Sequence, residues 1–201
     1  MMLSGRARTV WIGAALAALA GCSAAPPASL TDPAPDELAG WLSVAESASA
    51  RLANHPADQA AARILAFAVR ELEAGGVAPA EGQPDLITRW RQQAETAGAS
   101  RPGPPLRGRV LGPLYRRGVV APHGEARSEQ AFHGGQLARV TLAPAQPGIS
   151  LHVHGTADAR LVTCRQRQVH ECAWLPLFTE RYRLVVRNSG NRSVTYFLTM
   201  D

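Results

Sequence analysis

The chain has 201 residues, 46% of them hydrophobic and 18% charged, and three cysteines. These values suit one or two domains with a buried core, and they exclude a wholly disordered chain and a disulfide-dense miniprotein. Every basic residue is arginine, so the formal net charge of +5 rests on guanidinium groups, and no nucleic-acid recognition motif accompanies them.

The first 22 residues carry a targeting signal. Arg6 and Arg8 precede an uncharged apolar run, residues 10–20, and the signal closes with Leu19-Ala20-Gly21-Cys22. Eleven apolar residues are too few to span a bilayer as a helix, but they match the length of a signal-peptide core. The sequence therefore predicts a signal peptide at residues 1–21, which belongs to targeting and not to the fold.

Leu-Ala-Gly-Cys resembles the lipobox of bacterial lipoprotein precursors. The resemblance implies that Cys22 is S-acylated and becomes the N-terminus of the mature protein, which is thereby anchored to a membrane. Ser23 implies sorting to the outer membrane, facing the periplasm, because Asp at that position commonly signals inner-membrane retention in the family. The alternative is an ordinary secretory peptide. Residues 22–35, rich in Ala, Ser and Pro, predict a flexible tether.

A helical unit is predicted over residues 36–98, where apolar residues recur at three- and four-residue spacing. The first helix ends at His55-Pro56. The second has Pro56 in its first turn and ends at Gly75-Gly76, and the third runs from Pro84-Asp85 to Gly98. The expected core positions are Leu38, Trp41, Leu42, Ala45, Leu52, Ile64, Leu65, Ala68, Val69, Leu72, Leu86, Ile87, Trp90 and Ala94.

A Pro- and Gly-rich linker at residues 99–106 separates two halves of opposite charge. Residues 23–100 hold five Arg against ten acidic residues, whereas residues 101–201 hold fourteen Arg against six. The helical unit has few large apolar residues of its own. We therefore expect the helices to pack against the second half or against a partner.

The hydrophobic period changes to two in residues 107–201, which predicts an antiparallel β-sandwich and an α+β chain as a whole. Turn residues such as Gly134-Gly135 and Pro147-Gly148 separate the strands. The predicted strands are 128–132, 138–142, 149–154, 160–165, 169–174, 181–187 and 193–200.

Several of these segments resemble the bacterial pre-peptidase C-terminal domain, a small jelly-roll-like β-sandwich appended to secreted peptidases and other envelope proteins. The family often carries acidic residues beside its Leu-x-Val strand, in some members for calcium. His152 and His154 stand there instead, and calcium prefers oxygen ligands, so no calcium site is expected. The matching segments are Phe132, 135–136, 140–142, 151–153, 174–176, 182–186 and 194–199.

Cys164 and Cys172 remain once Cys22 is assigned to the lipid anchor. An even remainder in an oxidising compartment predicts a disulfide between neighbouring strands, with two free thiols or a metal pair as the alternatives. His152 and His154 are two residues apart on one strand and therefore share a face. They are weak candidates for a zinc or copper site, and we favour two solvent-facing side chains without metal.

Arg181, Arg183 and Arg187 form a row on the solvent side of another strand. The row is a candidate surface for an anionic sugar, a lipid A phosphate, the acidic helical half of the chain or a partner, and its alternative is a solvated face. The sequence contains no Gly-x-Ser-x-Gly, no His-Glu-x-x-His and no phosphate-binding loop before a helix. We therefore expect neither catalysis nor a cofactor.

The predicted function is that of a lipid-anchored envelope protein whose sandwich binds or scaffolds another envelope protein or glycan. Two alternatives stay open: an envelope hydrolase whose site is assembled from distant residues, and a periplasmic metal-handling protein.

Overall fold

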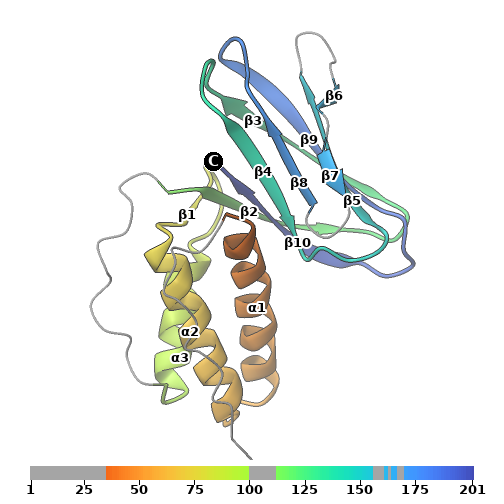
Figure 1. The fold of residues 1–201 in the computed structure, drawn as a ribbon. Helices are drawn as coiled ribbons and strands as arrows, with labels where there is room; N and C mark the ends of the chain where they lie inside the picture. The colour runs from red at the N-terminus through yellow and green to blue at the C-terminus, as the bar shows by residue number, and fades with distance from the viewer. Residues whose placement is uncertain (1–34, 100–111, 156–160, 163, 167–169) are drawn as a thin grey trace, which may run out of the picture. The chain divides into compact units, whose positions relative to one another are not determined.

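The computed structural model describes residues 35–99, 112–155, 161–162, 164–166 and 170–201, and Asp32–Asp201 form one compact unit (Figure 1). The predicted signal peptide, Cys22, the tether up to residue 34 and most of the linker lie outside the described residues. None of the described helices is long and apolar enough to cross a membrane.

Three helices begin the described chain: α1 (Pro35–Asn54), α2 (Gln59–Ala74) and α3 (Leu86–Thr96). Asp58 caps α2 by accepting a hydrogen bond from the Ala61 amide (2.9 Å), and Asp85 caps α3 through the Thr88 amide (3.0 Å). The second helix therefore starts at Gln59, and Pro56 lies before it and not in its first turn, because Asp58 is the N-cap.

The predicted apolar stripes form the helical core with two corrections. Trp90 is fully buried, whereas Trp41 is only half-buried and packs edge-on against Phe67 with ring centroids 5.3 Å apart. Ile64 is exposed, because the buried stripe of α2 runs through Ala61, Leu65 and the residues after it. Both corrected residues lie at the margin of their stripe.

Within the described residues, ten strands form two sheets, and all of these pair antiparallel except β1 with β2 (Figure 1). The six-stranded sheet has the order β1-β2-β10-β4-β8-β7, and the four-stranded sheet has the order β3-β9-β5-β6. The bounds are β1 Ala78–Pro79, β2 Leu114–Val120, β3 Glu125–Phe132, β4 Ala138–Ala143, β5 Ile149–Gly155, β6 Leu161–Val162, β7 Cys164–Gln166, β8 His170–Trp174, β9 Glu180–Asn188 and β10 Val194–Met200.

The two sheets pack face to face around one apolar core, which confirms the predicted α+β fold with a β-sandwich. The strand predicted at 160–165 is in fact two strands. β6 pairs with β5 in one sheet and β7 pairs with β8 in the other, so the chain crosses between sheets next to residue 163. Two strands were not predicted, namely β1, which lies between α2 and α3, and β2.

The helices pack on the six-stranded sheet through shared core residues. Tyr115 of β2 and Phe197 of β10 belong to the same buried cluster as the helical stripes. The Tyr115 hydroxyl accepts a hydrogen bond from the Leu86 amide (2.7 Å), and Arg117 forms an ion pair with Glu46 of α1 (2.5 Å). The expectation that the acidic helices pack on the basic half is therefore confirmed.

Candidate functional site

The outer face of the four-stranded sheet collects most of the polar side chains singled out in the sequence. Residues of β5 alternate between buried and half-buried, so His152 and His154 share the outer face while Leu151 and Val153 point into the core, as predicted. On β9 the exposed arginines alternate with buried residues in the same way. The histidine pair and the arginine row thus lie on one face.

Strand register brings these two sets into contact. β5 and β9 are hydrogen-bonded neighbours, and His154 lies directly opposite Arg183. Ser150 lies opposite Arg187, and His152 lies opposite Val185. Side chains directly opposite each other on one face of an antiparallel pair are about 5 Å apart at Cβ. Two candidates that are remote in sequence therefore form one surface.

An open hollow of about 270 Å3 lies on this surface. We call the hollow and the residues that line it the basic face. Val185, only 5% exposed, forms part of its lining although it points outward from the sheet. Arg181 lies outside the hollow and lines a second one of about 420 Å3 beside Arg116 and Glu129. The residues that line the basic face are Glu125, Arg127, His154, Gly155, Arg183, Val185 and Arg187.

Glu125 of β3 ties two of the arginines together. Its carboxylate accepts hydrogen bonds from Arg127 (2.8 Å) and from Arg187 (2.7 Å). The bond from Arg127 holds the pKa of Glu125 below its usual value, and the charge of Arg187 lowers it further. Arg183 forms no ion pair with any described residue. The lining holds three guanidinium groups and one carboxylate, and Glu129 of β3, directly opposite Arg183, is a second carboxylate beside the hollow, so the hollow stays positive by one charge.

Glu125 and Arg127 were missed in the sequence because the predicted strand began at Ser128. The signal was present: Glu125, Arg127 and Glu129 alternate with Ala126 and Ser128. Such alternation is typical of a strand with one solvent-facing side.

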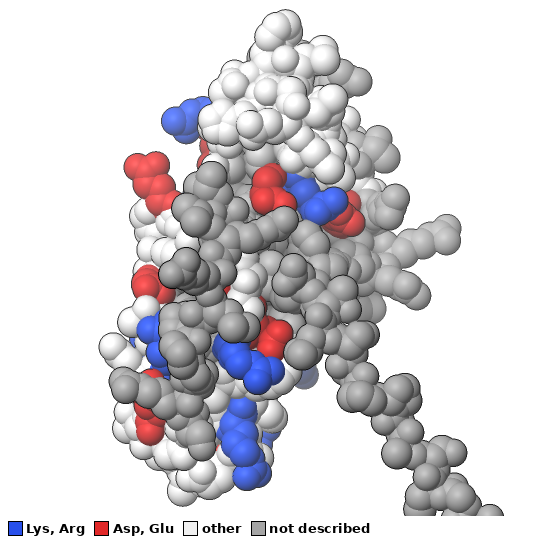
Figure 2. Space-filling view, turned by 60° about the vertical axis from the view of Figure 1, so that its left-hand side comes forward, with Lys and Arg blue, Asp and Glu red and all other residues white. Residues whose placement is uncertain are grey.

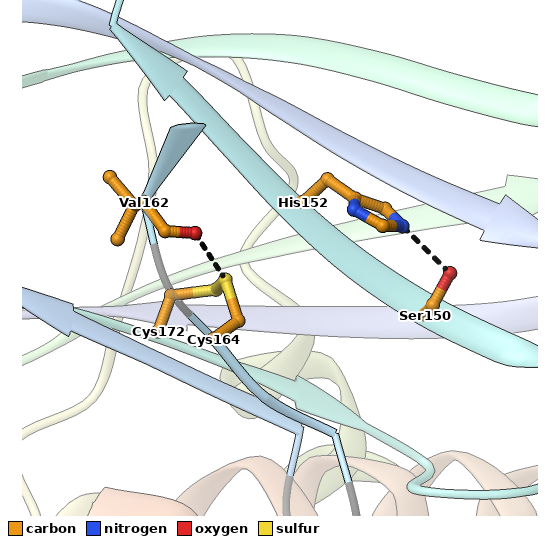
Figure 3. The surroundings of a disulfide bond; sticks show 5 residues. All are labelled: Ser150, His152, Val162, Cys164 and Cys172. Atoms are coloured by element: carbon orange, nitrogen blue, oxygen red, sulfur yellow. Dashed lines mark hydrogen bonds between the residues drawn. A yellow bond between two sulfur atoms is a disulfide. The ribbon is translucent and has the colours of Figure 1, made fainter. Parts of the chain in front are cut away.

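His152 contributes a neutral side chain to the outer face (Figure 3). Its Nε2 lies 3.1 Å from the Ser150 hydroxyl. Burial lowers the pKa of His152, and the positive charge of Arg187 lowers it further, so the ring is uncharged at neutral pH. As for metal binding, no group of three or more His, Cys, Asp or Glu side chains gathers anywhere in the described parts of the chain.

The predicted disulfide between Cys164 and Cys172 is present (Figure 3). The two residues are directly opposite in the β7–β8 pair, and Cys172 is fully buried in the sandwich core. The bond closes a short loop at the edge of the six-stranded sheet, next to the point where the chain changes sheets. Its role is to limit the unfolded chain, which makes it structural.

His170, two residues before Cys172, is 5% exposed, and its Nδ1 has no hydrogen-bond partner in the described structure. Burial lowers its pKa, so the unfolded chain binds protons more readily than the folded one. The contribution of His170 to the free energy of unfolding is therefore fully present above the unfolded pKa of about 6.5. Below that value this contribution falls by at most about 1.4 kcal/mol per pH unit.

We expect the thermal midpoint to fall as the pH is lowered from 7 to 5, and we expect His170→Gln to reduce this pH dependence. Differential scanning calorimetry between pH 5 and pH 7 measures the midpoint of both proteins. His55→Gln is the matched control, because His55 is exposed. An unchanged slope in His170→Gln would assign the acid sensitivity to other groups.

The fold and the basic face define an α+β protein with a β-sandwich that exposes an arginine-lined hollow. No protein-family model and no curated protein matches the chain. Among solved structures, the chain is similar to the periplasmic inhibitor of g-type lysozyme PliG from Aeromonas hydrophila, with 11% identity, 44% of this chain and 84% of that chain covered and a TM-score of 0.38.

PliG from Salmonella Typhimurium is similar over 44% of this chain and 89% of that chain, with 15% identity and a TM-score of 0.34. The pre-peptidase C-terminal domain of a Bacillus anthracis collagenase is similar over 43% of this chain and 87% of that chain, with 15% identity and a TM-score of 0.36. A domain of the kind named from the sequence is thus among the similar structures. Each similarity covers less than half of the chain.

Proposed function

We propose that this chain is a non-catalytic, lipid-anchored protein of the bacterial cell envelope, on the outer membrane and facing the periplasm. Its sandwich binds an anionic group of another envelope component at the basic face. The observation that carries the proposal is the convergence of Arg127, Arg183 and Arg187 around one open hollow.

Guanidinium chemistry favours an anionic ligand. Arginine presents a planar fork of donors that matches a carboxylate or phosphate with two parallel hydrogen bonds. Arg183 is exposed and forms no ion pair with a described residue, so its donors face solvent. Glu125 holds Arg127 and Arg187 at the other side of the hollow, which reduces the side-chain entropy that binding would cost. An acidic glycan or a phosphorylated sugar meets these requirements.

Two features support the envelope location. The Leu-Ala-Gly-Cys segment has the residue types and position of a lipidation signal. The Cys164–Cys172 disulfide suits a compartment outside the reducing cytosol. On this proposal Cys22 carries the acyl chains, and residues 23–34 connect them to α1.

We expect the purified protein to sediment with isolated peptidoglycan sacculi or with lipopolysaccharide vesicles, both of which are anionic. Arg183→Gln should weaken binding about tenfold, and added salt should weaken it further because exposed charges are screened. Quantitative co-sedimentation between 50 mM and 300 mM salt, conditions that span Debye lengths of roughly 6–14 Å, measures both effects.

Arg192→Gln is the matched control, since Arg192 is an exposed arginine in the turn between β9 and β10. It removes the same charge from the chain without touching the hollow. Equal losses in the two variants would mean that only net charge matters, and the basic face would not be a site. Absence of binding to both probes would also reject the proposal.

A further inference from the structure

Two loops at one end of the sandwich expose four large apolar side chains, which we call the apolar tip. Residues 133–137 connect β3 to β4, and residues 175–179 connect β8 to β9. Leu177 and Phe178 are 77% and 79% exposed, and Leu137 and Leu175 are 59% and 60% exposed. Single exposed leucines are common on proteins, but four in adjacent loops form a patch.

The two loops hold each other in place. The Gly135 amide donates a hydrogen bond to the Pro176 carbonyl oxygen (2.8 Å), and the Gly134 amide donates one to the Thr179 hydroxyl (3.0 Å). A Cβ atom on residue 134 would lie 2.8 Å from the backbone of Phe178, so glycine is needed for the loops to approach this closely. The exposure of the leucines is therefore built into the fold.

An aromatic cluster supports the apolar tip from inside the sandwich. Phe132 ends β3, Trp174 ends β8 and Tyr182 lies near the start of β9. The Trp174 ring centroid lies 4.9 Å from that of Phe132 and 4.9 Å from that of Tyr182. The packed rings lie at or near the strand ends from which both loops leave, so they hold the bases of the two loops in place.

The apolar tip carries no charge. Neither 133–137 nor 175–179 contains Asp, Glu, Lys or Arg. The end of the sandwich where β3 ends and β4 begins lies at the top of Figure 1, and the described residues at the very top of Figure 2 show neither blue nor red on the face in view. A fixed charge in either loop would oppose entry into a bilayer, and His133 is the single ionisable side chain that the two loops contain.

The apolar tip is a small patch. The four side chains expose roughly 500 Å2, near the upper limit for one patch on a monomer. Apolar areas of this size also occur in protein interfaces, which bury about 800 Å2 from each partner, slightly more than half of it apolar. The predicted lipid anchor favours a membrane, because a few protruding apolar side chains are sufficient as a second, weaker membrane contact beside a covalent lipid.

We propose that the apolar tip inserts into the interface of the lipid bilayer that holds the protein, an inference that rests on the proposed acylation of Cys22. Residues 23–34 span at most about 40 Å when extended, so they keep the domain close to the membrane surface. Tethering raises the effective concentration of the apolar tip at the bilayer and makes a weak contact persist.

Depth-dependent fluorescence quenching tests the proposal on the full-length protein, purified with its lipid and reconstituted into phosphatidylethanolamine–phosphatidylglycerol vesicles that carry brominated acyl chains. Phe178→Trp places a reporter in the apolar tip. Val119→Trp is its matched control, because Val119 is 57% exposed on β2 outside both loops. After subtraction of the unsubstituted protein, the reporter of Phe178→Trp should be quenched about twofold more than that of Val119→Trp.

Adding Leu177→Asp to Phe178→Trp should abolish the extra quenching, because a carboxylate is costly in the bilayer. Equal quenching of the two reporters would overturn the proposal. A shift of Phe178→Trp emission with protein concentration in the absence of lipid, accompanied by dimers in sedimentation, would instead make the apolar tip a protein interface and would also overturn it.

Mass spectrometry of the same sample tests the acylation separately. An acylated Cys22 with equal quenching of both reporters leaves the anchor in place and rejects membrane contact by the apolar tip. An unmodified protein whose Phe178→Trp reporter is still quenched rejects the anchor and retains the contact. An unmodified protein without selective quenching rejects both.

Discussion

Replacing Phe197 by alanine is expected to lower the free energy of unfolding by about 3–5 kcal/mol, since it removes a buried aromatic ring at a site that cannot collapse. Phe197 is 1% exposed, and its ring meets that of Trp90 edge-on with centroids 6.1 Å apart. The contact joins β10 to α3, so the loss affects both the helices and the six-stranded sheet.

Thermal unfolding followed by circular dichroism measures the effect of Phe197→Ala. Each kcal/mol lowers the midpoint by about 2–4 °C in a protein of this size, so we expect a shift of roughly 10 °C. Val119→Ala is the control, because Val119 is 57% exposed and its substitution should change stability by less than about 0.5 kcal/mol. A shift as small as the control's would show that the helices and the sheet are stable without this contact.

Replacing Cys22 by serine is expected to abolish acylation completely, because it removes the sulfur that the lipoprotein resemblance implies is acylated. The precursor should then keep residues 1–21 and migrate more slowly in gel electrophoresis. Metabolic labelling with radioactive palmitate, followed by immunoprecipitation, measures both outcomes in one experiment.

Ser23→Ala is the matched control for Cys22→Ser, since it changes the adjacent residue and leaves the thiol in place. It should be labelled and processed like the unsubstituted protein. Equal mobility of Cys22→Ser and the unsubstituted protein, with label in neither, would replace the lipid anchor by an ordinary secretory signal.

Local patterns were sufficient to predict the strands that have one buried and one solvent-facing side. The alternation in 149–154 and 181–187 predicted β5 and β9 to within one residue at each end. The Cys164–Cys172 pair was predictable because two cysteines eight residues apart suit neighbouring strands. In these cases the information lies within a few residues of the element itself.

β2 could not be predicted because both of its sides are partly buried. Tyr115 and Arg117 face the helices, while Leu114 and Val120 contact the sandwich core. Two consecutive arginines, Arg116 and Arg117, also hide any alternation in the sequence. A pattern of period two appears only where one side of a strand faces water.

The basic face and the apolar tip depend on tertiary structure. The histidines and the arginine row were separate candidates, and only the pairing of β5 with β9 places His154 opposite Arg183. The run from Leu175 to Phe178 has no periodicity that marks it as exposed. An apolar run is normally interpreted as buried, so its exposure follows only from the loop contacts at Gly134 and Gly135.

The strand order of the six-stranded sheet sets the moment at which the protein can fold during its synthesis. β10 lies between β2 and β4, so β2 has no antiparallel partner until residues 194–200 exist. At about 5–20 residues per second, the ribosome needs roughly 4–16 s to reach them after completing β2. If residues 1–21 direct export as proposed, we expect this delay to keep the polypeptide unfolded and able to thread through a translocation channel before the sheet closes on the far side.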